Sequence, residues 1–119
     1  MEDTIFGKIT RGEIPTEFLY EDDLCVVIRD LYPQAPTHVL IIPRQPIAML
    51  STASGDDQAL LGHLLLVAGK IAEQLGVEDA FRLVINNGEG GGQTVFHLHL
   101  HLLAGRDMKE GELAQGLAR

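Results

Sequence analysis

The feature that most restricts the fold of this chain is the alternating run His97-Leu98-His99-Leu100-His101-Leu102-Leu103. Alternation has the two-residue period of a β-strand, in which successive side chains point to opposite faces. We therefore expect a strand over Thr94–Leu103, with leucines on the core face and His97, His99 and His101 together on the other. Because an unperturbed histidine titrates at roughly pH 6.5, such a row can supply a nucleophile, an acid or a base.

Two other interpretations of the histidine row are simpler. One is a chance polar face on an edge strand. Against it, three of the five histidines of the chain occupy every second position of this one run. The other is a metal site, because histidine is a common metal ligand. Same-face neighbours in a strand are roughly 6.5–7 Å apart, so these three side chains do not easily converge on one ion. No cysteine or paired carboxylate stands close by in the sequence. We expect an enzyme that uses the histidines directly, with no metal and no cofactor.

A glycine-rich loop, Gly88–Gly92, precedes the row and leads into Gln93 and Thr94. Such a loop lets the backbone approach a ligand and can aim several N–H groups at one anion. A glycine run alone is weak evidence, because it usually marks a flexible connection. Directly before a histidine row, however, it would place an anion cradle beside a nucleophile, as phosphoryl or nucleotidyl transfer requires.

The rest of the chain shows the periodicities of an α+β domain. A short helix is expected over Asp3–Gly12, capped by Asp3 or Thr4, and a long helix over Asp57–Leu75, ended by Gly76. The expected strands are Glu17–Tyr20, Leu24–Arg29, His38–Ile42, Phe81–Asn86 and Thr94–Leu103. We predict about five mostly antiparallel strands with the helices against one face of the sheet.

Composition and charge exclude several functions. The 119 residues suffice for one domain, and a net charge of −8 repels polyphosphate backbones, so no nucleic-acid partner is expected. No apolar run approaches the ~18 residues of a membrane helix, so no membrane partner is expected. The start, Met1-Glu-Asp-Thr, is acidic where a secretion signal is basic, and the single cysteine, Cys25, excludes an internal disulfide. We expect a cytoplasmic protein.

The apolar stripe of the long helix is wider than one sheet contact requires. It consists of Leu60, Leu61, Leu64, Leu65, Ala68, Ile71, Ala72 and Leu75. A second apolar neighbour would cover the surplus, and twofold pairing is the common way to bury a self-complementary surface. We expect a homodimer.

Several motifs together resemble one protein family. They are Ile5-Phe-Gly-Lys-Ile, Glu13-Ile-Pro, Tyr20-Glu-Asp-Asp, Pro33-Gln-Ala-Pro-Thr-His38, Leu61-Gly-His63, Gly91-Gly-Gln-Thr-Val and the histidine row. From about Thr4 to Met108 the chain resembles the histidine-triad (HIT) superfamily, in its Hint branch of histidine-triad nucleotide-binding proteins. The resemblance implies a HIT domain over residues 1–108 and a sheet continued across a homodimer, whereas the charged tail over 109–119 departs from the family pattern.

The resemblance also implies a role for individual residues. His99 would be the nucleophile that forms a nucleotidyl-histidine intermediate, and His101 would contact the phosphate and help to protonate the leaving amine. The remaining catalytic residues would be Thr94 at the phosphate and His97 and His38, which would orient the nucleophile through a hydrogen-bond relay. The nucleotide-binding residues would be Asp30 at the ribose hydroxyls, Leu31, Ile28, Ile5 and Phe6 around the base, Asn86 at phosphate and ribose, and Gly92, Gln93 and Thr94 in the phosphate loop, with His99 and His101. Taken alone, Asp30 and Asn86 are typical of turns and the four apolar residues of a core.

The implied reaction is hydrolysis of the P–N bond of purine nucleoside 5′-phosphoramidates, with a purine nucleoside monophosphate as product. One alternative is a dinucleoside polyphosphate hydrolase, as in the Fhit branch; the acidic net charge and the lack of a Lys/Arg cluster near the phosphate loop argue against it. The other is a nucleotide-binding adaptor with incidental catalysis, in which four matching histidines would be unnecessary. His63 and Cys25 receive no functional role.

Overall fold

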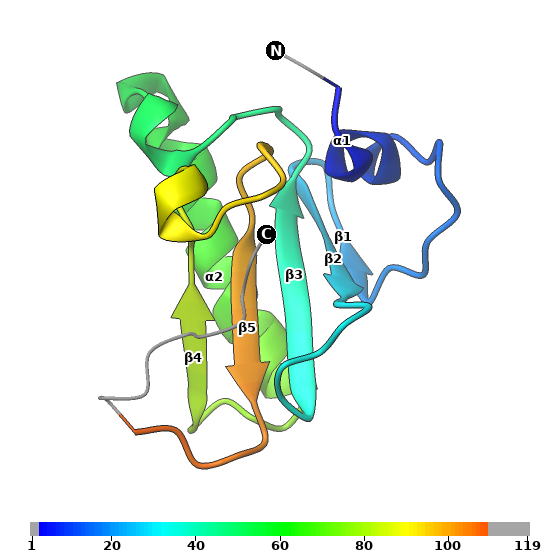
Figure 1. Cartoon of the computed structure of the whole chain (residues 1–119). Coiled ribbons are helices and arrows are strands. Elements are labelled where there is room, and N and C mark those ends of the chain that lie inside the picture. Colours follow the sequence, from blue (N-terminus) through cyan, green and yellow to red (C-terminus); the bar gives the residue numbers. More distant parts are fainter. Residues whose placement is uncertain (1–2, 110–119) are drawn as a thin grey trace.

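The computed structural model describes residues 3–109 and contains one antiparallel sheet of five strands (Figure 1). The strands are β1 (Tyr20–Glu21), β2 (Cys25–Arg29), β3 (Thr37–Pro43), β4 (Phe81–Val84) and β5 (Leu100–Ala104), in the spatial order β1-β2-β3-β5-β4. The helices are α1 (Ile5–Thr10) and α2 (Gln58–Gln74), with short 3-10 turns η1 (Leu50–Thr52), η2 (Gly55–Asp57) and η3 (Glu89–Gly91). The α+β class and the five-stranded antiparallel sheet are confirmed.

The two faces of the sheet bury different side chains. Val27 pairs with Ile41 and Ile28 with Leu40, so neighbouring residues of β2 and β3 point to opposite faces. The face toward α2 carries Cys25, Val27, Val39, Ile41, Leu100 and Leu102. The opposite face carries Val26, Ile28, Leu40 and Ile42, which pack against Phe6 and Ile9 of α1. The prediction that both helices cover one face is therefore wrong, because strands that are apolar on both faces need a cover on each side.

Helix α2 supplies much of the core. The η2 turn directly precedes α2 and is capped by Ser54, whose side chain accepts the Asp56 N–H at 3.2 Å. Gly76, with a φ of 73°, follows the end of α2. Its buried residues are Leu60, Leu64, Val67, Ala68, Ile71 and Ala72. Leu65 and Leu66 are 54% and 77% exposed. Apolar surface therefore extends beyond the contact with the sheet, as the wide stripe predicted.

Strand β5 is shorter than the sequence predicts. It begins at Leu100, whereas the alternating pattern predicted a strand from Thr94. The preceding residues bond to other parts of the chain instead of to a neighbouring strand; the Leu98 N–H, for example, donates to the Ile47 carbonyl at 2.7 Å. Of the three histidines in the row, only His101 therefore lies in a strand.

Other boundaries differ by smaller amounts. Helix α1 is shorter than Asp3–Gly12, and its cap is Thr4, whose hydroxyl accepts the Gly7 N–H at 3.1 Å. The strand expected over Glu17–Tyr20 is the two-residue β1, and β4 ends at Val84 instead of Asn86. Of the tail expected over 109–119, only Lys109 lies within the described residues.

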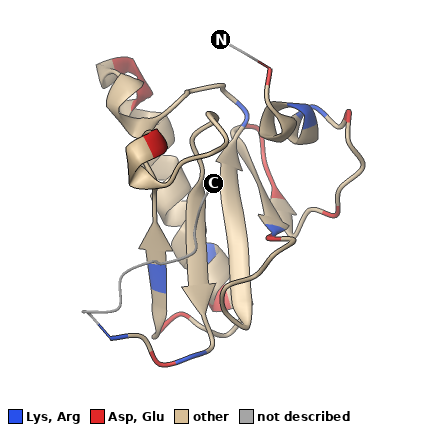
Figure 2. Cartoon of the chain, viewed as in Figure 1, with Lys and Arg blue, Asp and Glu red and all other residues tan. Residues whose placement is uncertain are grey.

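In the ribbon view of Figure 2, the Lys and Arg residues of the described chain are spread over several elements and do not gather in one region. Across residues 3–109, no helix has both the length and the apolar character that crossing a membrane requires.

Candidate active site

Two buried histidine rings lie next to each other at the start of β5. His99 directly precedes the strand and His101 is its second residue. Both residues are buried, including their Nε2 atoms, and their ring centroids are 5.0 Å apart. The Phe6 ring of α1 meets the His99 ring edge-on, at a centroid distance of 4.7 Å. The pair therefore lies on the α1 face of the sheet.

A main-chain atom fixes the protonation of His99. Its Nδ1 lies 2.8 Å from the carbonyl oxygen of His97. Since a carbonyl oxygen only accepts, Nδ1 carries the hydrogen, and Nε2 of the neutral ring keeps its lone pair. In the neutral ring, the Nε2 atom of His99 therefore has the lone pair that a nucleophile requires.

His101 has the opposite arrangement. The Gln34 N–H donates to His38 Nδ1 at 3.0 Å, so the hydrogen of the His38 ring is on Nε2. This N–H donates to His101 Nδ1 at 2.9 Å, which leaves the hydrogen of the neutral His101 ring on Nε2. The two neighbouring rings thus offer different groups at Nε2, a lone pair on His99 and an N–H on His101.

The His97 side chain is separate from this pair. Its Nε2–H donates to the Pro43 carbonyl at 2.7 Å, and its ring lines a hollow of about 210 Å³ together with Thr4, Arg11 and Arg44. Burial lowers the pKa of His97, and the charge of Arg11 adds to the shift, although the bond to Pro43 opposes it. The prediction of three histidines on one strand face is wrong for His97, because the chain is not extended there. His97 contacts His99 through its main-chain carbonyl oxygen, which accepts the hydrogen bond from His99 Nδ1.

An apolar pocket of about 490 Å³ is lined by residues of α1, the end of β2 and the middle of β3. The residues expected around the base, Ile5, Phe6, Ile28 and Leu31, all line it, and so does Thr94. The further lining residues are Ile9, Arg29, Tyr32, Gln34, Leu40 and Val95. Sequence reasoning missed Tyr32, for which an aromatic residue directly after Leu31 was the available signal. Because Leu31 and Tyr32 are 85% and 73% exposed, the rim of the pocket is apolar.

Asp30 lies outside the set of residues that line this pocket. Its Oδ1 accepts the Tyr32 N–H at 2.8 Å, and its Oδ2 lies 3.3 Å from His38 Nε2. One carboxylate oxygen of Asp30 and one ring nitrogen each of His38 and His101 lie within 4.8 Å of one another. Unlike the histidine row, this set does converge: a hydrogen bond joins His38 to His101, and the Asp30 carboxylate lies beside His38. The sequence did not predict this contact of Asp30 with the histidines.

The glycine-rich loop closes on itself. The N–H groups of Gly91, Gly92 and Gln93 each donate at 3.0 Å to carbonyls of Gly88 and Glu89. Three of the N–H groups that we expected in the anion cradle are therefore used within the loop itself.

The Gln93 side chain is buried and shapes this loop. Its Oε1 accepts the Gly88 N–H at 2.8 Å, and its Nε2 donates to the carbonyls of Ala48 and Val95 at 2.8 and 3.0 Å. Asn86, half-buried two residues past β4, is also outside the lining of the apolar pocket. Thr94 is the residue of the expected phosphate loop that lines it.

A second cluster lies on the α2 face, where Asp22, Cys25 and His63 approach within 4.8 Å of one another. Asp22 Oδ2 accepts from His63 Nε2 at 2.7 Å and from the Tyr20 hydroxyl at 2.8 Å, and Oδ1 accepts the N–H groups of Leu24 and Cys25 at 2.8 and 2.9 Å. Burial opposes ionisation of Asp22, but these hydrogen bonds outweigh it and lower its pKa. Burial raises the pKa of the Cys25 thiol to about 12, so the thiol is neutral. The cluster fastens the β1–β2 hairpin to α2.

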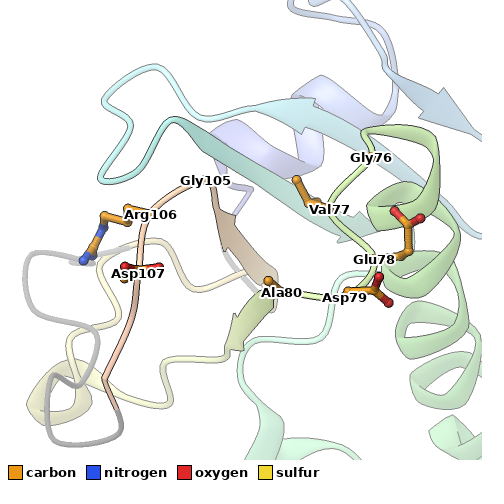
Figure 3. A pocket seen from close by; sticks show the side chains of 8 residues that line it. All are labelled: Gly76, Val77, Glu78, Asp79, Ala80, Gly105, Arg106 and Asp107. Atoms are coloured by element: carbon orange, nitrogen blue, oxygen red, sulfur yellow. The ribbon is translucent and has the colours of Figure 1, made fainter.

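Another hollow, of about 330 Å³, lies between the segment before β4 and the segment after β5 (Figure 3). Glu78 and Asp79 lie on one side of it, and Arg106 and Asp107 on the other. None of the residues expected at the functional site lines this hollow.

The antiparallel sheet thus carries a buried histidine pair beside an apolar pocket, an arrangement suited to histidine chemistry on a small ligand. The model of the HIT domain family matches residues 11–108. The chain belongs to this family, as its motifs indicated.

Known proteins of this family are similar over nearly the whole chain. A HIT-like protein of Synechocystis sp. is 63% identical over 88% of this chain and 92% of its own length. The purine nucleoside phosphoramidase of Escherichia coli is 50% identical over 90% of this chain and 91% of its own. The crystal structure of a HIT family hydrolase from Legionella pneumophila superposes with a TM-score of 0.88 at 46% identity, covering 91% of this chain and 97% of that one. These likenesses place the chain among the HIT family hydrolases.

Proposed function

We propose that the protein is a purine nucleoside phosphoramidase, which hydrolyses the P–N bond of a purine nucleoside 5′-phosphoramidate to the monophosphate and an amine. The observation that carries this proposal is the pair of neighbouring Nε2 atoms, with a lone pair on His99 and an N–H on His101. The 50% identity with the Escherichia coli purine nucleoside phosphoramidase supports the same reaction.

In the first step, His99 Nε2 donates its lone pair to phosphorus, and the P–N bond breaks with its electron pair moving to nitrogen. His101, protonated on both ring nitrogens at this stage, gives its Nε2 proton to the departing amine. The intermediate is nucleotidyl-His99. The hydrogen bond from its Nδ1 to the His97 carbonyl stabilises the positive charge that the ring gains.

In the second step, water attacks the same phosphorus, and the bond to His99 breaks. His101 Nε2, which lost its proton in the first step, takes one from the attacking water. The proton balance therefore closes over the two steps, and His99 is released with its lone pair restored. Covalent catalysis of this kind replaces one difficult displacement by two easier ones.

The purine occupies the apolar pocket between Phe6 and Leu31. Thr94 lies at the same pocket, which suits it to the phosphate together with His99 and His101. Asp30 and Asn86 are assigned to the ribose and phosphate on the family resemblance. No step requires a metal or a cofactor.

Two copies pair, in this proposal, through α2 and the edge strand β4 into one continuous sheet. The exposure of Leu65 and Leu66 and the position of β4 at the end of the strand order support this arrangement. A single, buried cysteine with a neutral thiol suits the reducing cytoplasm, where we place the enzyme.

The His99→Gly variant tests the chemistry. We expect kcat/KM for a fluorogenic adenosine phosphoramidate to fall by roughly 10⁴-fold or more, because the covalent route is lost. Binding of adenosine monophosphate persists, since the pocket and the leucines that flank position 99 are unchanged. The control is His63→Gln on α2, which retains wild-type turnover. Near-native activity of His99→Gly contradicts the mechanism.

A parallel assay with diadenosine polyphosphate separates the alternatives. Faster cleavage of this substrate than of the phosphoramidate favours a polyphosphate hydrolase. Tight binding of adenosine monophosphate without turnover of either substrate favours an adaptor.

A further inference from the structure

We propose that Asp30 is a positioning residue, whose buried carboxylate is the counter-ion that lets His38 and His101 together hold the proton given to the leaving amine. The inference rests on the proposed function, in which His101 is the acid. It differs from the contact with the ribose hydroxyls that the family resemblance implies for Asp30.

The carboxylate of Asp30 is enclosed with the His38 ring. Both side chains are 0% exposed, and Asp30 Oδ2 lies 3.3 Å from His38 Nε2. Asp30 Oδ1 accepts the Tyr32 N–H, which holds the carboxylate in this orientation. The carboxylate thus faces the histidines, and it is outside the lining of the pocket that we assign to the purine.

His38 has one hydrogen with two acceptors in reach. Its Nδ1 accepts the Gln34 N–H, so only Nε2 can donate. That N–H lies 2.9 Å from His101 Nδ1 and 3.3 Å from Asp30 Oδ2. A second proton on the His101 ring occupies Nδ1, the atom that the His38 N–H now contacts. Two N–H groups would then face each other, and a rotation of the His38 ring that directs its N–H to Asp30 Oδ2 removes this conflict, so the carboxylate makes room for the extra proton.

The charge balance favours this protonated state. With both rings neutral, the enclosed group carries the single negative charge of Asp30; with one more proton, the sum is zero. A carboxylate close to a histidine favours its cationic form, most strongly in a buried site, where water screens the attraction little. The titratable side chains close to His101 include His38, at 2.9 Å, His99, at a centroid distance of 5.0 Å, and Asp30, with a carboxylate oxygen within 4.8 Å of a ring nitrogen. The positive charge on the His38–His101 pair keeps His99 neutral and nucleophilic.

The test is the pH dependence of kcat for Asp30→Asn in the full chain, with a fluorogenic adenosine phosphoramidate. The asparagine keeps the shape of the side chain and removes its charge. We expect the alkaline limb of the kcat profile to move to lower pH by roughly 1–2 units, with kcat at pH 8 about 10-fold below wild type. Asp30→Glu, which restores the charge, recovers part of the shift.

A role confined to the ribose gives a different result. In that case Asp30→Asn raises KM, the kcat profile coincides with that of the wild type, and the proposal is overturned. A 2′,3′-dideoxy substrate separates the two roles further, because it removes the hydroxyls without touching the carboxylate. We expect the wild type to keep its alkaline limb on this substrate.

A second measurement needs no turnover. Nitrogen-15 NMR of the histidine rings follows the His101 titration directly, and we expect loss of its second proton at lower pH in Asp30→Asn than in the wild type. Identical titrations overturn the proposal. If the wild type fails to cleave phosphoramidates, the proposed function fails, and this comparison still decides the role of Asp30.

Discussion

His99 and His101 are identical side chains two positions apart, and main-chain groups elsewhere give them opposite chemistry. The His97 carbonyl sets the hydrogen of His99, and the Gln34 N–H sets that of His101 through His38. The sequence does not identify the His97 carbonyl or the Gln34 N–H as a partner, because every residue except proline has both a main-chain carbonyl and a main-chain N–H. The histidine row predicted which side chains matter, but which nitrogen carries each proton had to come from the folded chain.

At the same scale, Tyr32 provides a direct reporter of nucleotide binding. The chain has no tryptophan and two tyrosines, so Tyr20→Phe leaves Tyr32 as the main fluorophore. We expect adenosine monophosphate to change this emission saturably, because a purine in the proposed position lies beside the Tyr32 ring at the pocket rim. Tyr32→Leu should weaken binding about 10-fold, the equivalent of ~1.4 kcal/mol. Unchanged emission at saturating nucleotide contradicts the position assigned to the base.

Among the elements, the sequence predicted the two helices and the central strands well. Their periodic apolar patterns reflect burial that is local to each element, as in α2. The segment before β5 was misassigned because its alternation resembles a strand, whereas its hydrogen bonds run to distant residues such as Ile47. For the same reason the closure of the glycine-rich loop by Gln93 and the approach of Asp30 to His38 were missed. Contacts between residues far apart in the chain produce no periodic pattern in the sequence.

The loop before β5 should depend on Gln93. Replacing Gln93 by alanine leaves the Gly88 N–H and the Ala48 carbonyl without their buried partner. We expect the free energy of unfolding in urea to fall by about 2–3 kcal/mol, and kcat to fall as well, because the same segment places His99. The control is Gln74→Ala, whose amide makes an exposed bond to the Leu19 carbonyl at 3.4 Å. That change should stay within ~0.5 kcal/mol, and equal effects of the two substitutions contradict the role given to Gln93.

The attachment of the β1–β2 hairpin to α2 should depend on pH through Asp22. Its pKa is lowered from the ordinary 3.8, so the ionised group adds stability above about pH 4 that is lost as the pH falls toward the lowered value. We expect Asp22→Asn to be less stable than the wild type by about 1–3 kcal/mol at pH 7, with the difference shrinking below pH 4. Urea unfolding at several pH values measures this. The neighbouring Asp23→Asn is the control, and a difference for Asp22→Asn that is independent of pH contradicts the assignment.

On the scale of the whole molecule, the exposed leucines of α2 predict pairing. Light scattering at micromolar concentration should give twice the chain mass of 13.0 kDa. Leu66→Lys, which places a charge on a side chain that is 77% exposed in the single chain, should shift the mass toward one copy. Leu24→Lys, on the β1–β2 turn and 45% exposed, should leave the pairing intact. A wild-type mass near 13.0 kDa contradicts the dimer.

Neighbouring residues in β2 and β3 point to opposite faces of the sheet, and this alternation restricts where related chains can change in length. Deleting one residue from β3 would shift its register against β2 by one position and turn Leu40, at the pocket, toward α2. The same deletion would carry His38 away from His101. A substitution changes a side chain on one face of the sheet. An insertion or deletion within these strands instead moves pocket side chains to the α2 face and core side chains to the pocket face. Natural length variation should therefore fall in the connections, such as residues 11–19 and 44–49, and should be absent from the paired strands.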